Sequence, residues 1–141
     1  MTQSRPYAAA LDRLRTASLR PTRQRLALAK LLFEGGDRHV TAEQVHDEAA
    51  MAGIRVSLAT VYNTLHQFTR AGLMREVVVE AGRSYFDTNV SDHHHVFFEA
   101  NGRLVDVPAA QIDVRGLPEL PPGTEVTRID VILRASSPTA K

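Results

Sequence analysis

The chain has 141 residues, 43% of them hydrophobic, which suits one ordinary domain or two very small ones. It contains no cysteine, so disulfides, thiolate zinc sites and cysteine nucleophiles are excluded, and His, Asp or Glu must hold any metal. No apolar stretch approaches the roughly 18 residues that span a bilayer, and residues 1–10 lack the hydrophobic core of a secretory signal. We therefore expect a cytoplasmic protein with no membrane partner.

Positive charge is concentrated in the first part of the chain. Residues 1–85 hold twelve bases against eight acids, whereas residues 86–141 hold five bases against eight acids. A basic half joined to an acidic half is typical of a nucleic-acid-binding module attached to a sensing or assembly module. Composition alone leaves a solvated basic face open as the alternative.

Two helices are predicted near the start of the chain. Residues 7–18 form the first, because leucines recur at helical spacing and a proline precedes them. Thr22 is a suitable cap for the second helix, which extends to Phe33. The glycine pair at 35–36 then ends it.

Two further helices follow with strong end signals. Thr41 and Gln44 form a capping box that opens the third helix, which closes before Gly53. The fourth helix covers residues 57–70, with Ser57 as its cap and a glycine after its end. Its apolar side consists of Val61, Leu65 and Phe68.

A β-hairpin is predicted directly after these helices. Residues 73–80 and 83–88 are rich in β-formers, and Ala81-Gly82 between them is a two-residue turn signal. Helices that end in a hairpin are typical of a winged helix-turn-helix. The fourth helix would then enter the major groove of DNA.

The candidate DNA-binding residues follow from that arrangement. Polar side chains on the exposed face of the fourth helix, Gln67 among them, suit base edges, and arginines near the start of the second helix suit phosphates. Packing of Tyr62 between helices is the alternative to a DNA contact. The candidates are Arg20, Arg23, Arg25, Ser57, Thr60, Tyr62 and Asn63.

The second part of the chain has a different character. Strands are predicted at 94–99, 103–107 and 124–134, with a short helix after Pro108 and a loop at 117–123. Such a small sheet can bury little, so we expect it to pair with a second copy and form a homodimer. The predicted class is α+β: a winged helix-turn-helix at 1–88, a small α/β dimerisation and sensing domain at 89–135, and a frayed tail at 136–141.

Half of the six histidines stand in one run, His93-His94-His95, beside Asp92. Imidazole is the commonest side-chain metal ligand, so the run indicates a metal or haem site. On a strand, His93 and His95 share one face and His94 lies on the other. Hydrogen bonding at a domain interface is the simpler alternative.

Two other classes of function are compatible with a histidine-rich site. A hydrolytic metal site made of Asp87, His93 and His95 lacks an evident general base nearby, so we do not expect an enzyme. A haem-storage module is the other class, and it predicts no sequence-selective DNA binding.

Several stretches resemble one known family. Residues 56–65, Phe68, 71–73 and 92–95 closely resemble the Fur family of metal-responsive repressors, and the resemblance extends over residues 19–131. Within the family, the chain is most similar to the iron response regulators, Irr, of alphaproteobacteria, because it has the triple histidine but no paired cysteines.

This resemblance implies a regulatory metal site on His39, Asp87, His93 and His95, with His39 in the loop between the second and third helices. The ligands suit Fe(II), Mn(II) or Zn(II). A second site on Asp92, His94 and Asp113 is incomplete, because Ile129 stands near the position of its expected histidine.

Similarity to Irr further implies haem as the signal, with His93, His94 and His95 as ligands or contacts. It implies double-stranded operator DNA as a partner and a haem-delivering enzyme as a candidate partner. The regulator of iron and haem homeostasis would be active in low iron and inactivated by haem. The alternative is a Fur- or PerR-like regulator that uses the metal directly as corepressor or for peroxide sensing through His oxidation.

Overall fold

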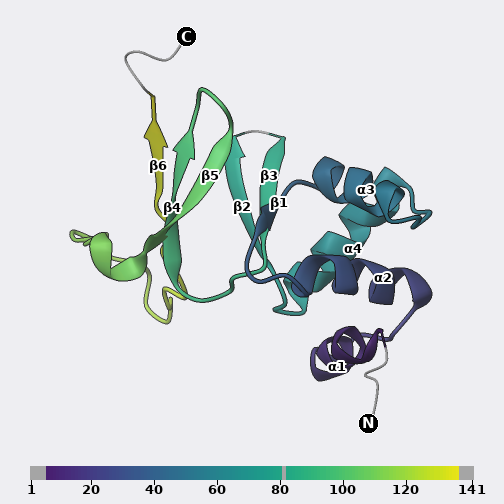
Figure 1. The fold of residues 1–141 in the computed structure, drawn as a ribbon. Coiled ribbons are helices and arrows are strands. Elements are labelled where there is room, and N and C mark those ends of the chain that lie inside the picture. The colour runs from purple at the N-terminus through teal and green to yellow at the C-terminus, as the bar shows by residue number, and fades with distance from the viewer. Residues whose placement is uncertain (1–5, 81, 137–141) are drawn as a thin grey trace. The chain divides into compact units, whose positions relative to one another are not determined.

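The computed structural model describes residues 6–80 and 82–136 (Figure 1). It confirms the α+β class, with four α-helices and two three-stranded sheets in the described ranges. The chain divides into two compact units, Met1–Val90 and Ser91–Lys141. None of the described helices is both long and apolar enough to cross a membrane.

The first unit holds the helices that the sequence predicts. Each of the last three begins where a side-chain hydroxyl accepts a hydrogen bond from the backbone amide three residues later, in the pairs Thr22–Arg25, Thr41–Gln44 and Ser57–Thr60. The caps fix the helix starts at the predicted residues. The bounds are α1 (Ala8–Thr16), α2 (Arg23–Phe33), α3 (Ala42–Met51) and α4 (Leu58–Arg70).

An antiparallel sheet completes the first unit, in the order β1-β3-β2. The predicted hairpin is confirmed as β2 (Arg75–Glu80) and β3 (Arg83–Asp87), while Ala81 of its predicted turn lies outside the described residues. The expectation that His39 lies in a loop is wrong, because it begins the short strand β1 (His39–Val40). Two residues carry no readable periodicity, and pairing with β3 creates this strand.

Apolar residues from all four helices pack together with Val40 of β1 and Phe86 of β3 in one core. Phe68 of α4 and Phe86 of β3 are both fully buried in it. The members of this core are Ala10, Leu14, Leu28, Ala29, Leu32, Val40, Ala42, Val45, Ala49, Val61, Leu65, Phe68, Met74 and Phe86. The apolar face predicted for α4 is therefore confirmed.

The second unit is a three-stranded sheet in the order β5-β4-β6. The central strand pairs antiparallel with β5 and parallel with β6. The predicted short helix after Pro108 is confirmed as a 3-10 turn. The bounds are β4 (His93–Phe98), β5 (Arg103–Pro108), η1 (Ala109–Gln111) and β6 (Ile132–Ala135).

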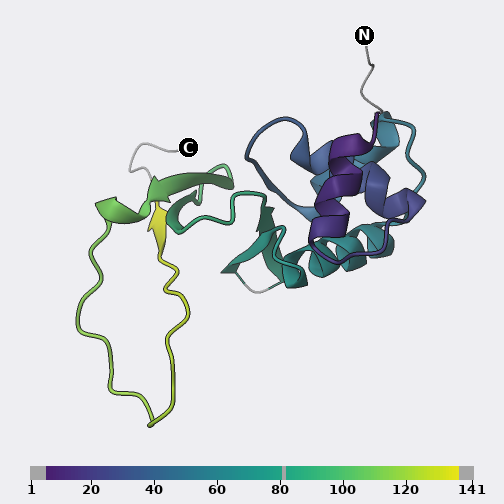
Figure 2. The same cartoon turned by 90° about the horizontal axis from the view of Figure 1, so that it is seen from below.

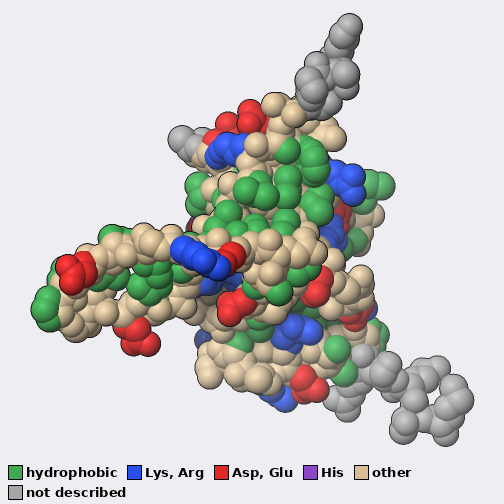
Figure 3. All heavy atoms as spheres, turned by 90° about the vertical axis from the view of Figure 1, so that its left-hand side faces the viewer, with side chains coloured by type: hydrophobic (Ala, Val, Ile, Leu, Met, Phe, Trp, Pro, Cys, Tyr) green, Lys and Arg blue, Asp and Glu red, His purple; other side chains and the backbone are tan. Residues whose placement is uncertain are grey.

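The strand predicted at 124–134 is wrong over 124–131, which have no regular structure. Pairing with β4 begins where the amide of His95 donates to the carbonyl of Val131, so a strand forms only from there onward. The whole stretch 112–131 runs as a loop outside the sheet (Figure 2). Hydrophobic side chains lie on the surface of this loop (Figure 3). The predicted tail falls mainly on residues 137–141, which are outside the described ranges.

Candidate functional site

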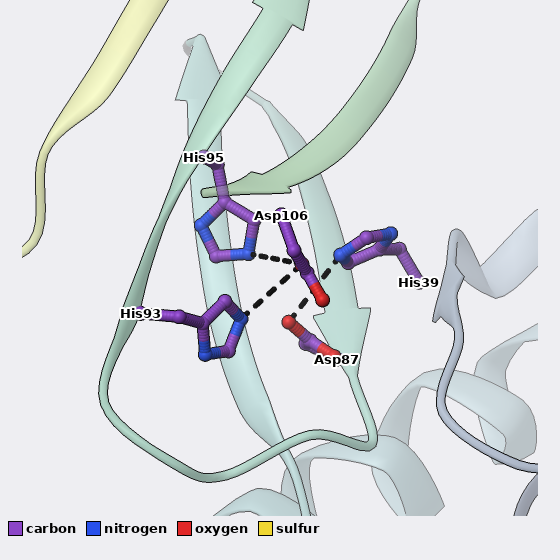
Figure 4. A group of neighbouring side chains, drawn as sticks. All are labelled: His39, Asp87, His93, His95 and Asp106. Atoms are coloured by element: carbon purple, nitrogen blue, oxygen red, sulfur yellow. Dashed lines mark ion pairs between the residues drawn. The ribbon is translucent and has the colours of Figure 1, made fainter. Parts of the chain in front are cut away.

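Two histidines of the second unit converge on one carboxylate. The Nε2 atoms of His93 and His95 lie 3.3 Å and 3.4 Å from Oδ1 of Asp106, and the ring centroids are 4.6 Å apart (Figure 4). Alternation along β4 puts both rings on one face, and β5 supplies Asp106 directly opposite His95. Both imidazoles are buried, so little water competes for this group.

The hydrogen bonds of His93 determine its tautomer. Its Nδ1 lies 2.6 Å from the carbonyl oxygen of Ser91, which can only accept, so Nδ1 carries a proton. The Nε2 of a neutral ring then turns a lone pair toward the carboxylate of Asp106. Two lone-pair groups facing each other need a cation or a further proton between them. Donation of the distal N–H to a backbone carbonyl is also the usual arrangement of a metal-bound histidine.

The first unit holds a second pair of candidate ligands. The Nε2 of His39 lies 3.4 Å from Oδ2 of Asp87, whose side chain is 1% exposed (Figure 4). The two residues are direct partners in the pairing of β1 with β3. The other oxygen of Asp87 accepts the amide hydrogen of Asn89, which holds the carboxylate in place.

The backbone beside His39 is tied down from two sides. The amide of Arg38 donates to Oγ1 of Thr88, and the guanidinium of Arg38 forms a two-point ion pair with Glu48 of α3 at 2.9 Å and 2.6 Å. The neighbouring guanidinium lowers the pKa of Glu48 below its ordinary value. The position of His39 is thereby connected to α3.

His94 has a different role from its neighbours, as the alternation predicts. Its Nδ1 accepts the amide hydrogen of Val131, so in the neutral ring Nε2 carries the proton. Neither nitrogen then offers a lone pair to a metal. Asp92 is exposed, and Asp113 pairs with Arg115 at 2.8 Å. Within the described residues, Asp92, His94 and Asp113 do not form a group of metal ligands.

The candidate DNA-binding residues lie on α4 or its cap, and on the first turn of α2 or just before it. Arg20, Arg23, Ser57 and Asn63 are exposed, whereas Thr60, Tyr62 and Arg25 are half-buried. A polar cleft of about 360 Å³ separates the start of α2 from α4. It is lined by Arg20, Thr22, Gln24, Arg25, Thr60, Asn63, Thr64 and Gln67.

Tyr62 contacts another helix, the alternative that the sequence left open. Its hydroxyl donates to Oε1 of Glu43 on α3 at 2.7 Å. This hydrogen bond raises the pKa of Tyr62 and lowers the pKa of Glu43. The phenol is thus held in one position at the side of α4.

Sequence reasoning did not identify Asp106 or Glu43. A signal for Asp106 was present, because it is an acid on the strand predicted at 103–107, which follows the predicted strand at 94–99 that carries His94 and His95. Glu43 had no such signal, since its contact with Tyr62 depends on how α3 packs on α4.

Comparison with known proteins agrees with this architecture. Residues 16–131 match the model of the Ferric uptake regulator family. The Peroxide-responsive repressor PerR of Staphylococcus epidermidis is 33% identical over 100 residues, which are 71% of this chain and 66% of that protein. The chain therefore aligns with about two thirds of the length of this relative.

Solved structures are similar over more of the chain. The ferric uptake regulator from Pseudomonas aeruginosa with manganese has a TM-score of 0.72 at 28% identity, covering 92% of this chain and 98% of the other. The ferric uptake regulator of Vibrio cholerae has a TM-score of 0.69 at 23% identity, covering 89% and 98%.

Proposed function

The chain belongs to the ferric uptake regulator family, and from this premise we propose that it is a metal-responsive transcriptional regulator that binds operator DNA as a homodimer. Members of the family are transcription regulators rather than enzymes. In this function the first unit binds DNA through α4, and the second unit pairs with its copy. Arg20, Arg23, Ser57, Thr60, Tyr62 and Asn63 are the proposed DNA contacts.

The carboxylate of Asp106 between two imidazole nitrogens is the observation that carries the metal response. A divalent cation bound there satisfies both rings and the carboxylate at once. Three imidazoles and two carboxylates, including the pair from the first unit, form a nitrogen and oxygen donor set that suits Fe(II), Mn(II) or Zn(II).

We place one ion between both groups. Asp87 ends β3 and His93 begins β4, so only residues 88–92 separate them in sequence. At most about 3.3–3.6 Å per residue, this connection is short enough for both groups to reach a common ion. The proposed ligands are His39, Asp87, His93, His95 and Asp106.

An ion shared by two units changes which arrangements of the dimer are favoured. A ligand that favours one arrangement by about 3 kcal/mol changes DNA affinity by roughly 150-fold. The Pseudomonas aeruginosa relative with manganese supports the choice of Mn(II) as a first probe.

The test combines metal analysis of the purified protein with DNA binding. Sequences are selected from a random duplex library by the Mn(II)-loaded protein, and affinity for the selected duplex is measured with and without Mn(II), Fe(II) or Zn(II). We expect tight selective binding that depends on metal and is lost in His95→Ala. The control variant His46→Ala, which replaces an isolated histidine on α3, should retain it. Selection of no sequence, or the same affinity in both variants with and without metal, would contradict the proposal.

Peroxide sensing at the same ion is the second candidate, because the Staphylococcus epidermidis relative is a peroxide-responsive repressor. Iron-catalysed oxidation would add oxygen to a ligand histidine. Mass spectrometry of the Fe(II)-loaded protein after peroxide treatment tests this. An increase of about 16 Da, one oxygen atom, on a peptide that contains His39, His93 or His95 supports it, and an unmodified protein that stays on DNA opposes it.

A haem response is the narrower candidate that rests on the three consecutive histidines. For His94 to ligate haem iron through Nδ1, it would have to release the amide of Val131. A Soret band that disappears when His93, His94 and His95 are replaced by alanine, together with DNA release on haem addition, is the expected result. Tighter DNA binding with haem would overturn the expected inactivation by haem.

A further inference from the structure

All three guanidinium nitrogens of Arg25 are engaged inside the first unit. Nε and Nη2 donate to Oε1 of Gln67 at 3.1 Å and 2.9 Å, and Nη1 donates to the carbonyl oxygen of Arg20 at 2.8 Å. The side chain therefore joins the segment that precedes α2, α2 itself and the later part of α4. Gln67 lies 42 residues away in sequence.

The chemistry of this contact leaves one orientation for the amide. A guanidinium has donors and no acceptor, so Gln67 must face Arg25 with its oxygen. Two hydrogen bonds from a charged donor to one oxygen hold the amide more firmly than a neutral contact. Both side chains are half-buried, which limits competition from water.

Arg23 stands two residues earlier and differs in each of these respects. It is exposed, and the described residues give its side chain no hydrogen bond or ion pair. It is therefore available to a phosphate, which is the role that the sequence predicts for both arginines. Arg25 could reach a phosphate only by giving up its bonds to Gln67 and Arg20.

We propose that Arg25 is a positioning residue, which fixes α4 against the start of α2 through Gln67, and not a phosphate ligand as the sequence predicts. This inference rests on the proposed DNA-binding function. Phosphate contacts set the register of a protein on the duplex, and base contacts set its specificity. The Arg25–Gln67 link holds the two kinds of contact at one separation, because Arg20 lies at one side of the cleft and Thr60 and Asn63 lie at the other.

Substitution of an arginine by lysine distinguishes the effect of its positive charge from the effect of its two hydrogen bonds to Gln67. A lysine still attracts a phosphate as a point charge but cannot reproduce the planar contact with Gln67. We expect Arg25→Lys to weaken binding to the selected duplex by about tenfold or more, and Arg23→Lys to weaken it by only about two- to threefold. Equal, small losses in both variants would overturn the proposal.

Salt dependence gives an independent measurement. Removal of one phosphate contact reduces the slope of log affinity against log salt concentration by about 0.9. We expect Arg23→Gln to reduce the slope by about this amount and to weaken all sequences alike. Arg25→Gln should reduce the slope by less than about half as much and lower the preference for the selected duplex over random DNA. A full reduction of the slope in Arg25→Gln identifies a phosphate ligand and contradicts the proposal.

Gln67→Ala supplies a second variant in case changes at Arg25 prevent folding. It removes the acceptor and retains the arginine charge. We expect it to weaken binding to the selected duplex as much as Arg25→Lys does. The double variant should be no worse than either single variant, because both changes remove the same link. Additive losses would contradict the link.

The proposed function and this inference can fail separately. If the unaltered protein selects no sequence, the proposed function fails. If it selects a sequence but Arg25 behaves like Arg23, this inference alone fails.

Discussion

The two units differ in how much hydrophobic surface each one buries. The first unit packs four helices and a sheet around a core with fully buried phenylalanine, leucine and valine. In the described part of the second unit, the buried large hydrophobic residues are Phe97 and Leu104 alone. Its exposed large hydrophobic residues are Phe98, Val114, Leu117, Leu120, Val126, Ile129 and Leu133.

The two units therefore differ in the source of their stability. A unit with its own core keeps its structure at any protein concentration, whereas a thin sheet with an exposed apolar side gains stability when a second copy covers it. The ion proposed between the units would add stability to the thinner one as well. Each measurement below tests one side of this contrast.

The largest expected effect is in the core of the first unit. Phe68→Ala removes a fully buried ring and should lower the free energy of unfolding by about 3–5 kcal/mol. Denaturant unfolding followed by circular dichroism measures it, with Met51→Ala, a 91% exposed position, as control. A loss below about 1 kcal/mol would show that this core is not what stabilises the unit.

Metal stabilisation is expected to be somewhat smaller. With Mn(II) at a hundred times its dissociation constant, the folded protein should gain about 2.7 kcal/mol, seen as a higher melting temperature. His95→Ala should abolish most of the increase, because it removes a nitrogen from the Asp106 group. The same increase in His95→Ala would place the ion elsewhere.

Dimer formation provides the next test. Leu133 of β6 and Val78 of β2 are 46% and 57% exposed on strands of different units. Leu133→Asp should weaken the dimer at least about tenfold, or about 1.4 kcal/mol, while Val78→Asp should leave it intact. Sedimentation across micromolar concentrations measures both variants. If both substitutions, or neither of them, weakened the dimer, the second unit would not be the one that forms it.

The smallest effect concerns acid sensitivity of the first unit. Arg38 lowers the pKa of Glu48 in the folded protein, so their interaction contributes fully above the ordinary value of 4.5 and is lost as pH falls through the folded pKa. Glu48→Gln should therefore reduce stability near neutral pH and flatten its decline below pH 4.5. We expect less than about 1 kcal/mol, because the pair is partly exposed. An unchanged pH profile in Glu48→Gln would show that the pair adds no stability.

Local signals in the sequence predicted most of the first unit. Thr22, Thr41 and Ser57 mark helix starts because each side chain accepts a hydrogen bond from the amide three residues later. This signal is contained in a few consecutive residues of the sequence. Strands β1 and β6 depend instead on a distant neighbour. Val40 forms a strand because β3 passes beside it, and residues 124–130 do not form one because the described sheet offers them no backbone partner.

The candidate ligands were predictable to a similar extent. Alternation correctly separates His94 from His93 and His95, because it is a local property of a strand. The participation of Asp106 in the site depends on the register of β4 with β5, and the tautomer of His93 depends on the carbonyl of Ser91. Neither is contained in the spacing of the histidines.

The parallel pairing of β4 with β6 has a consequence for the order of folding. The hairpin of β4 and β5 closes a short turn, whereas the bond between His94 and Val131 joins residues 37 apart and must overcome a larger loss of chain entropy. The hairpin should therefore form early and β6 should join late. His94 should reach its final ring orientation only at that last step, whereas His93 and His95 face Asp106 as soon as the hairpin has formed.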